Sequence, residues 1–374
     1  MLADQKNFDL IVVGAGIVGL AHAWMGWRRG WRVAVIERDH RCVGASVRNF
    51  GFVTVTGQRS GETWRRARRS RDLWAELAPQ AGIEVLHTGL WVVARRPLAL
   101  DVLAEFADTD MGRSCELHVG SRWGERAPGL RSSEAAGALY SPHELRVESR
   151  EAIPRLAAWL QSQGVCFVWG QEALGLEGSR VHGPQQTWTG ERVVVCPGTE
   201  LNGVARQMMP AHALQLTRLQ MLRVRPPARY RLPSAVMGDL SLVRYHGYAD
   251  LESSAALLQQ LRLECPQSLA DGIHLIAVQS RDGTLVVGDS HHAHDSPEPF
   301  ASEDVDERIL GHLRELLDLP GYDVVERWTG VYPVGHAADC LIEAPAPGQR
   351  LVLVTSGTGA STAFAIAEEV VQTW

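Results

Sequence analysis

The chain has 374 residues, of which 45% are hydrophobic and 21% are charged, and its formal net charge is −6. This composition excludes disordered, collagen-like and disulfide-scaffold proteins, and the negative charge implies no general attraction to nucleic acid. The six scattered cysteines show no CxxC pair or zinc spacing, so we expect reduced thiols and a cytoplasmic protein. We expect no membrane span, because the uncharged run over residues 10–27 carries glycines at fixed intervals and a histidine.

The predicted elements alternate in character along the chain. A strand, a helix and a strand fit within residues 9–36, which is the size of a βαβ unit. Between residues 216 and 290, several β-like runs without helical crossovers indicate an antiparallel sheet. The other expected elements are a helix over 63–77, strands over 85–95 with Gly89 in a turn, a helix from Ser149, strands at 165–169 and 192–196, helices over 251–263 and 305–317, a strand over 351–355 and a helix over 361–372. Within the β-like region, the run LSLVRY (residues 240–245) is expected to be a strand.

The sequence GAGIVG at residues 14–19 follows the first strand and opens the first helix. Gly14 allows a tight turn, Gly16 lets the backbone approach a pyrophosphate, and Gly19 lets helix and strand pack closely. The helix N-terminus offers backbone N–H groups to the phosphates. Glu37 ends the second strand, where its carboxylate can accept both hydroxyls of an adenosine ribose. An acid at this position disfavours NADP, and the pattern predicts a dinucleotide site.

The loop over residues 44–51 favours FAD over NAD, and two glycine turns occur later in the chain. The small-residue loop over 44–51 suits a pyrophosphate and an isoalloxazine ring, with Ser46 bonding a phosphate oxygen and Asn49 and Gly51 beside the ring. Glycine turns follow the strands that end near residues 196 and 355. The helix that begins after the second turn could direct its N-terminus at the flavin and stabilise the anionic reduced ring.

The sequences GAGIVG with Glu37, VVVCPG at 193–198 and SGTGAS at 356–361 resemble the FAD-dependent oxidoreductases of the D-amino acid oxidase, glycine oxidase and sarcosine oxidase superfamily. The resemblance covers residues 8–374 and implies an α/β chain, α+β overall, with a Rossmann-type FAD-binding domain and an interleaved antiparallel-sheet substrate domain. The FAD-binding domain is expected over residues 1–80, 145–200 and 325–374, and the substrate domain over residues 81–144 and 201–324. The implied cofactor-binding residues are Gly14, Gly16, Ile17, Val18, Gly19, Glu37, Arg38, Ser46, Asn49, Phe50, Gly51, Ala173, Cys196, Gly198, Gly330, Gly357, Thr358 and Gly359.

Four stretches also resemble a bacterial subgroup associated with aminophosphonate catabolism: GASVRNFGFV, LTRLQMLRV, GDSHH and ERWTGVYP. The chain departs from this subgroup at residues 333–337, where a more basic stretch is usual, and at His292, where an acid is common. Some relatives attach the flavin through a Cys near residues 330–332 or a His near residues 47–48, and neither is present here. The FAD is therefore expected to be non-covalent.

The expected substrate is a small anionic amine, which is an amino acid, an N-methyl amino acid or an aminophosphonate. Hydride transfer to flavin N5 would give an imine that hydrolyses to an aldehyde or keto acid, with oxygen or another acceptor taking the electrons. The predicted catalytic residues are His291, Arg244, Tyr332, Tyr245 and Arg48. Arg244 is expected on a strand as the main anchor for the acidic end, while Arg218 has a structural role.

Several alternatives remain open at this stage. A 2-hydroxy-acid oxidoreductase on the same fold, a flavin-binding subunit without turnover, and a nicotinamide dehydrogenase each fit part of the sequence. The histidines at 291, 292 and 294 with Asp295 resemble metal ligands, but a loop or substrate pocket is favoured and no metal is predicted. The arginines between residues 65 and 71 are interpreted as a solvated helix face.

Overall fold

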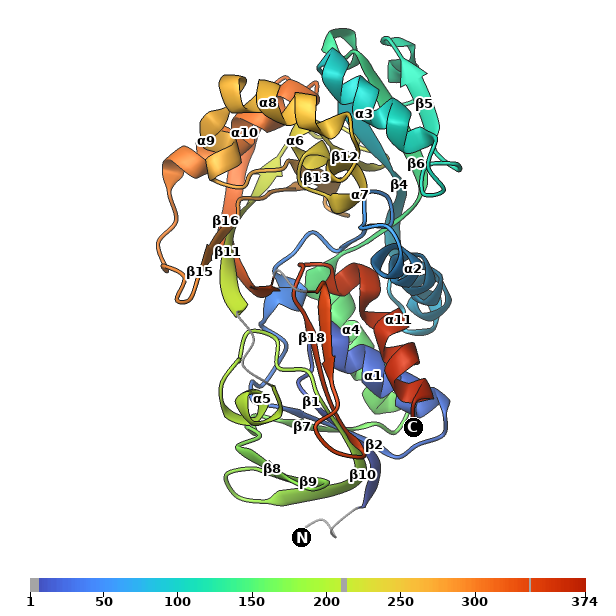
Figure 1. The fold of residues 1–374 in the computed structure, drawn as a ribbon, viewed down its shortest axis with the longest axis vertical. Coiled ribbons are helices and arrows are strands. Elements are labelled where there is room, and N and C mark those ends of the chain that lie inside the picture. The colour runs from blue at the N-terminus through green and yellow to red at the C-terminus, as the bar shows by residue number, and fades with distance from the viewer. Residues whose placement is uncertain (1–6, 210–213, 336–337) are drawn as a thin grey trace.

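The computed structural model describes residues 7–209, 214–335 and 338–374. Two sheets lie one above the other along the long axis of the molecule, and helices cover them (Figure 1). His336 and Ala337, which end the divergent stretch after Tyr332, lie outside the described residues. No helix in the described ranges is long and apolar enough to cross a membrane.

The first sheet is built on five parallel strands in the order β18-β10-β1-β2-β7, with β17 antiparallel at the β18 edge. Its strands are β1 (Phe8–Val13), β2 (Val33–Glu37), β7 (Cys166–Trp169), β10 (Thr187–Val195), β17 (Cys340–Glu343) and β18 (Gln349–Val354), and β8 (Gly175–Glu177) and β9 (Arg180–His182) extend it from β10. Leu10 and Val12 pack on one face with α1 (Ile17–Arg28), α4 (Ser149–Ser162) and α11 (Gly359–Gln372). Ile11 packs on the other face with α5 (Gly203–Met208). Burial on both faces explains the apolar run at 10–13.

The second sheet is largely antiparallel, with only β12 and β4 paired in parallel. Its order is β15-β11-β14-β13-β12-β4-β6-β3, while β16 pairs with β11 and β5 with β6. These strands are β3 (Phe52–Val53), β4 (Val85–Ala94), β5 (Glu116–Val119), β6 (Gly137–Val147), β11 (Leu214–Arg225), β12 (Ala235–Met237), β13 (Ile276–Gln279), β14 (Leu285–Gly288), β15 (His292–His294) and β16 (Asp323–Gly335). The helices around it are α3 (Pro97–Ala107), α6 (Asp239–Leu242), α7 (His246–Ala249), α8 (Ser254–Glu264), α9 (Pro266–Ala270) and α10 (Glu303–Leu316). The 3₁₀ turns are η1 (Ala45–Val47), η2 (Arg122–Glu125) and η3 (Ser132–Glu134).

Two local expectations were wrong, and one strand was missed. The run LSLVRY forms α6 and the turn after it instead of a strand, with Leu240 and Leu242 buried in the core. A short apolar run cannot be assigned to helix or strand by periodicity alone. Gly89 lies in a bulge within the single strand β4, at φ +79°, instead of a turn between two strands. The three-residue strand β12 was not expected.

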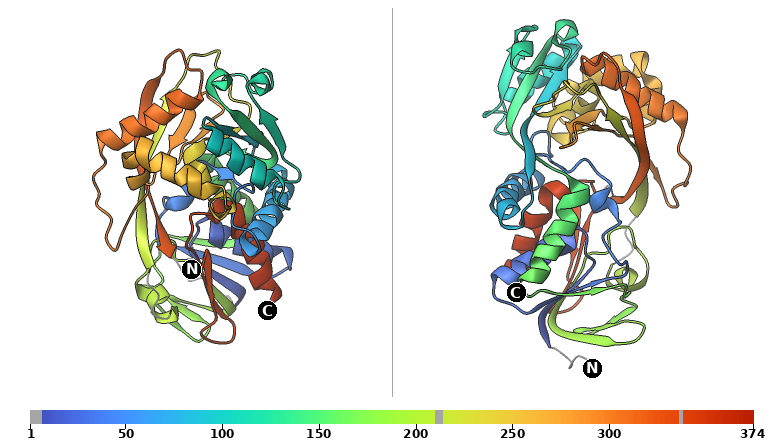
Figure 2. Two further views of the ribbon diagram at one scale, coloured as in Figure 1. Left: turned by 45° about the horizontal axis from the view of Figure 1, so that its top comes forward. Right: turned by 180° about the vertical axis from the view of Figure 1, so that it is seen from behind.

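Segments from distant parts of the sequence alternate between the two sheets, as Figure 2 shows from two further directions. The predicted domain boundary at residue 325 falls inside β16, which pairs with β11 in the second sheet. At the opposite end of β16, residues 330–335 lie over the carboxyl edge of the first sheet, where Val334 bridges to Ser356. Long strands thus reach from one sheet to the other.

The helix α2 (Glu62–Gln80) packs against α11 and fixes the start of that helix. The indole Nε1 of Trp74 donates a hydrogen bond of 2.9 Å to the carbonyl of Ala360, and its ring packs edge-on against Phe364. On the outer side, Arg66 and Arg69 form ion pairs with Glu369 and Glu368 of α11. These two arginines therefore join two helices.

We expect Trp74→Ala to destabilise the protein by about 3–5 kcal/mol, because it opens a cavity beneath the first turn of α11. Trp74→Phe keeps most of the ring packing and loses the hydrogen bond to Ala360, so it should cost about 1 kcal/mol. Urea denaturation followed by fluorescence measures both values. Equal losses for the two variants would show that packing at this position is not the dominant contribution.

Candidate active site

A cavity of about 540 Å³ lies between the carboxyl edge of the first sheet and the concave side of the second. It is enclosed by the N-terminal turns of α1 and α11, the loops 45–50 and 54–59, the turn 244–246, and residues 330–335 of β16. The structure places most of the predicted site residues on this wall: Gly16, Ile17, Val18, Gly19, Ser46, Arg48, Asn49, Phe50, Cys196, Gly198, Arg244, Tyr245, His291, Gly330, Tyr332, Gly357, Thr358 and Gly359.

The glycine loop brings β1, α1 and β10 into close contact. Gly14 has φ +101°, and a Cβ at this position would lie 2.4 Å from the carbonyl oxygen of Cys196. A Cβ on Gly19 would lie 1.8 Å from the carbonyl oxygen of Gly14. Both positions therefore require glycine, as the turn and close packing of a dinucleotide-binding loop demand. The loop lies between β1 and β10, where the strand order reverses and ligands bind in open α/β sheets.

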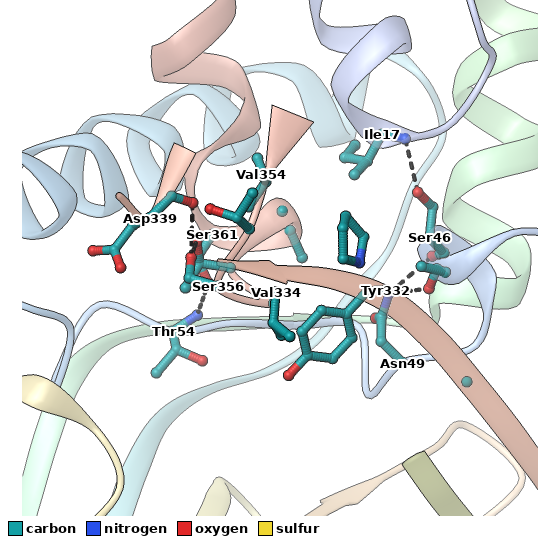
Figure 3. A pocket seen from close by; sticks show the side chains of 18 of the residues that line it. Ile17, Ser46, Asn49, Thr54, Tyr332, Val334, Asp339, Val354, Ser356 and Ser361 are labelled. Carbon is teal, nitrogen blue, oxygen red and sulfur yellow. Dashed lines mark hydrogen bonds between the residues drawn. The ribbon is translucent and has the colours of Figure 1, made fainter. Parts of the chain in front are cut away.

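Two polar side chains hold this loop. The hydroxyl of Ser46 accepts a 2.9 Å hydrogen bond from the backbone N–H of Ile17 in the first turn of α1 (Figure 3). The carboxylate of Glu37 accepts hydrogen bonds from the backbone N–H groups of Ala15, at 2.7 Å, and Asp39, at 3.1 Å. Glu37 thus stands beside the glycine loop, at the end of β2, as expected for the ribose contact of a dinucleotide.

The second helix N-terminus belongs to α11. Neither Gly16 before α1 nor Thr358 before α11 makes a side-chain capping hydrogen bond. Ser361 in the first turn of α11 accepts a 2.8 Å hydrogen bond from the N–H of Thr54, which ties α11 to the loop below the second sheet (Figure 3). Two helix N-termini with their partial positive charge therefore reach one cavity, an arrangement suited to anionic groups.

Five predicted cofactor contacts lie outside the cavity wall. Gly14, Glu37 and Gly51 support the loops behind it; a Cβ on Gly51 would lie 1.8 Å from the carbonyl oxygen of Val147. Arg38 instead pairs with Glu200 at 3.0 Å. Ala173 packs against the apolar side of the first sheet.

At the end of the cavity formed by the second sheet, a group of titratable side chains comes together: Arg244, Tyr245, His274, Asp289, His291 and Tyr332. His274 and Asp289 were not predicted. Asp289 lies two residues before His291 in the GDSHH sequence, directly after β14, so the position of a carboxylate at a strand end was the signal available. No sequence feature distinguished His274, which precedes β13.

Arg244 does not lie on a strand as expected. It is in the turn between α6 and α7, which is anchored by a 2.9 Å hydrogen bond from the N–H of Gly247 to the carbonyl of Gly57. Its side chain lines the cavity and is accessible to solvent. Within the described ranges, no carboxylate forms an ion pair with it.

The protonation of this group is governed by burial and by Arg244. Burial raises the pKa of the Asp289 carboxyl to about 7, while the nearby Arg244 guanidinium opposes that rise. Burial, reinforced by Arg244, holds the pKa of His274 and His291 well below the usual range, so both rings are neutral at pH 7. Burial also raises the pKa of Tyr332 to about 12 and that of Tyr245 further.

Other predicted candidates make their hydrogen bonds and ion pairs outside this group. The Nε atom of Arg48 donates a 2.7 Å hydrogen bond to the carbonyl of Val43 in its own exposed loop. His292 contacts Asp271 at 3.1 Å, and Asp295 accepts a hydrogen bond from Gln215, so these two side chains do not join His291 in a metal site. Arg218 hydrogen-bonds to the carbonyl of Phe300, which agrees with the structural role expected for it.

A comparison with protein-family models identifies the family. The family model of the FAD dependent oxidoreductases (DAO) matches residues 9–373. The chain therefore belongs to this family and is an FAD-dependent oxidoreductase. A curated relative, the coproporphyrinogen III oxidase of Propionibacterium freudenreichii subsp. freudenreichii, is 45% identical over 58 residues, which are 16% of this chain and 10% of that protein. The chain thus spans about a tenth of the curated relative that it matches.

Solved structures with the same fold cover nearly the whole chain. Glycine oxidase from Geobacillus kaustophilus superposes with a TM-score of 0.78 at 19% identity, covering 98% of this chain and 94% of that one. L-proline dehydrogenase from P. horikoshii gives a TM-score of 0.76 at 17% identity, covering 98% and 93%. L-α-glycerophosphate oxidase from Mycoplasma pneumoniae, solved with FAD bound, superposes with a TM-score of 0.74 at 15% identity, covering 99% of this chain and 95% of that one. At these identities the likeness shows the fold.

The cavity fits FAD by its own chemistry. Gly14 and Gly19 keep the loop clear of side chains, and the helix start at Ile17 presents backbone N–H groups as a pyrophosphate requires. Glu37 and Ser46 lie beside that loop with oxygens suited to ribose and phosphate. The start of α11 faces the same cavity from the other side and suits the negative charge of a reduced flavin.

We expect Glu37→Ala to weaken FAD binding by about 1–3 kcal/mol, because the ribose would lose charge-assisted hydrogen bonds. Turnover of the FAD-saturated variant should be close to that of wild type, since Glu37 lies outside the cavity wall. Titration of the apoprotein with FAD measures the affinity, and Glu200→Ala serves as a control because Glu200 contacts Arg38 and the N–H of Asn202 and lies outside the cavity wall. Unchanged FAD affinity in Glu37→Ala would show that this carboxylate does not hold the ribose.

Proposed function

We propose that this protein oxidises the C–N bond of a small amine that also carries an acidic group, with FAD held non-covalently. The observation that supports the proposal most strongly is Arg244, a guanidinium without a carboxylate partner among the described residues, on the wall of the FAD cavity. A cation in this position suits a carboxylate or phosphonate. The amine-oxidising enzymes among the structural neighbours, such as glycine oxidase, support the same substrate class.

The chain's own residues would orient the substrate. Arg244 would hold the acidic end, and the neutral rings of Tyr245 and Tyr332 would limit the size of the group beside it. Fixing the acidic end sets the direction of the C–H bond, which lowers the entropic cost of reaction. Bound FAD supplies the oxidant that takes the hydride. Loss of hydride from carbon and of a proton from nitrogen leaves an imine, which water hydrolyses.

The substrate range follows from the guanidinium of Arg244. Arg244 can form paired hydrogen bonds with a carboxylate or a phosphonate, so amino acids, N-methyl amino acids and aminophosphonates are all candidates. The stretches that resemble the aminophosphonate subgroup include GDSHH, which provides Asp289 and His291 to the cavity. An anaerobic screen of these three classes for bleaching of the flavin absorbance identifies the substrate, and absence of bleaching by all three would reject the proposal.

The purified protein should be yellow, and acid precipitation should release all of the colour as FAD. The reason is that the residues at 330–332 include no Cys and those at 47–48 no His to which a flavin could be linked. Absorbance and mass spectrometry of the supernatant provide the measurement. A coloured pellet would contradict the non-covalent attachment, and FMN in the supernatant would contradict the proposed ribose contact of Glu37.

Arg244→Ala should lower kcat/KM for the acidic amine by about 1.5–3 kcal/mol, because a charged hydrogen-bonding partner is lost. The same amine without its acidic group should be affected much less. Steady-state kinetics on this substrate pair give the comparison, with Arg218→Ala as the matched control on β11. Equal losses on both substrates would mean that the substitution disturbs the flavin or the fold, and the anchoring role would be abandoned.

A further inference from the structure

The carboxyl group of Asp289 lies between two buried imidazole rings at the end of the FAD cavity. Its Oδ1 is 3.3 Å from Nε2 of His274, and its Oδ2 is 3.6 Å from Nε2 of His291. The two rings stack with centroids 5.0 Å apart. Asp289 is 5% exposed and His274 is 4% exposed, so bulk water does not solvate this group.

The hydrogen bonds around the cluster leave no proton between Nε2 of His291 and the carboxylate of Asp289. Nδ1 of His291 lies 3.0 Å from the carbonyl oxygen of Gly272, which can only accept, so Nδ1 carries the proton of the neutral ring. Nε2 of His291 then presents a lone pair toward the Asp289 carboxyl. An ionised carboxylate facing a lone pair has no donor between them. The pair is completed by a proton that arrives from elsewhere.

Other buried atoms of the cluster also lack partners. Within the described residues, Oδ1 of Asp289 and Nδ1 of His274 form no hydrogen bond. A buried polar atom without a partner is costly unless a ligand or water satisfies it. Because Asp289 and His274 both line the cavity, a substrate in the cavity can reach them.

The surroundings of Asp289 supply one full positive charge. The charged and titratable groups that face it come from four segments: Arg244 and Tyr245 in the α6–α7 turn, His274 before β13, His291 after β14 and Tyr332 on β16. The two imidazoles and two phenols are neutral at pH 7. With Asp289 ionised, the groups around it present one cation, Arg244, and one anion, Asp289, which match a small zwitterion. The other charged residues on the cavity wall are Arg48 and the ion pair of Arg59 with Asp339.

We propose that Asp289 is a catalytic residue: it binds the ammonium end of the substrate, opposite Arg244, and accepts its proton before the C–H bond breaks. This inference rests on the proposed amine oxidation and deepens it. His274 and His291 are positioning residues, whose rings flank the carboxyl group at 3.3 and 3.6 Å and limit where it can lie. The specificity that follows is for a zwitterion over a simple anion when Asp289 is ionised.

The step balances without a further reactant. An N–H bond of the ammonium group breaks, and its proton goes to the Asp289 carboxylate, leaving the nitrogen lone pair free. The lone pair then forms the C=N bond as the hydride leaves carbon for FAD, the oxidant that the family supplies. The substrate loses two electrons, which bound FAD would accept, and the product is the protonated imine. A carboxyl pKa raised to about 7 suits a base that works near neutral pH.

The same three side chains could in principle hold a metal ion, since their ligand atoms lie within 4.8 Å of one another. The charge of the site argues against this, because the single carboxylate is already opposed by the guanidinium of Arg244. The purified protein should therefore contain no stoichiometric divalent metal. One zinc or iron per chain bound by these residues would overturn the proposal, because the metal would occupy the lone pairs that receive the proton.

Acetate is a probe that requires no turnover, because it carries the anion and lacks the ammonium group. Acetate should bind beside Arg244 only when Asp289 is protonated, since two carboxylates would otherwise repel. Its affinity, followed by perturbation of the flavin spectrum, should fall about tenfold per pH unit above pH 7 in the wild type. Asp289→Asn should bind acetate with the same affinity from pH 6 to 9. The proposal would be overturned if the affinity of the wild type for acetate were independent of pH, or if acetate did not bind at all.

The pH dependence of flavin reduction tests the catalytic part. With the amine found in the anaerobic screen, wild-type kcat/KM should rise as the pH increases through about 7 and then level off, because ionised Asp289 accepts the proton. In Asp289→Asn the rate should be at least tenfold lower at pH 8 and should follow the fraction of unprotonated amine, about tenfold per unit up to the amine's own pKa. An unchanged profile in Asp289→Asn would overturn the role of Asp289.

Two controls separate the possible failures. Asp306→Asn removes another buried carboxylate with a raised pKa, on α10 and outside the cavity, and should leave both profiles unchanged. If Asp289→Asn does not fold with FAD, the wild-type acetate profile still decides the question. If no amine reduces the flavin, the proposed function fails; if an amine reduces it while acetate binding is independent of pH, only the inference about Asp289 fails.

Discussion

The architecture depends on the contact between Gly14 and Gly19, where helix α1 approaches the end of β1 without an intervening side chain. This contact fixes the N-terminus of α1 at the place where the parallel strand order reverses between β1 and β10. The start of α11 reaches the same cavity from the other side, fastened by Trp74 and Ser361. Two helix N-termini with partial positive charge on one cavity suit a large anionic cofactor.

The substrate end of the cavity depends on a different kind of constraint. Its charged groups come from separate segments, and each is tied to a turn or a strand end: Arg244 between α6 and α7, Asp289 after β14 and Tyr332 on β16. The second sheet brings these segments together because β11 pairs with both β14 and β16. The interleaving of the chain between the two sheets thus places the glycine loop at one end of a single cavity and the charged group around Arg244 at the other.

The sequence predicted the first of these two ends better than the second. The spacing of Gly14, Gly16 and Gly19 has a direct physical meaning, so the loop, its strand and its helix were predicted correctly. Arg244 was assigned to a strand because a six-residue apolar run contains no periodicity that separates a helical turn from a strand. Asp289 and His274 lie side by side at the open end of the β13–β14 hairpin; both β-like runs were expected, but not the register that places these two residues together.

The central claim is that a substrate held by Arg244 on the cavity wall loses hydride from a carbon that bears nitrogen. The most direct measurement is a single anaerobic turnover with an amino acid and the 2-hydroxy acid of the same carbon skeleton, which share the same carboxylate. The account predicts that the amine bleaches the flavin and that one ammonia, or one methylamine for an N-methyl substrate, is released per flavin after hydrolysis. Bleaching by the hydroxy acid alone, with no nitrogen release from the amine, would contradict it.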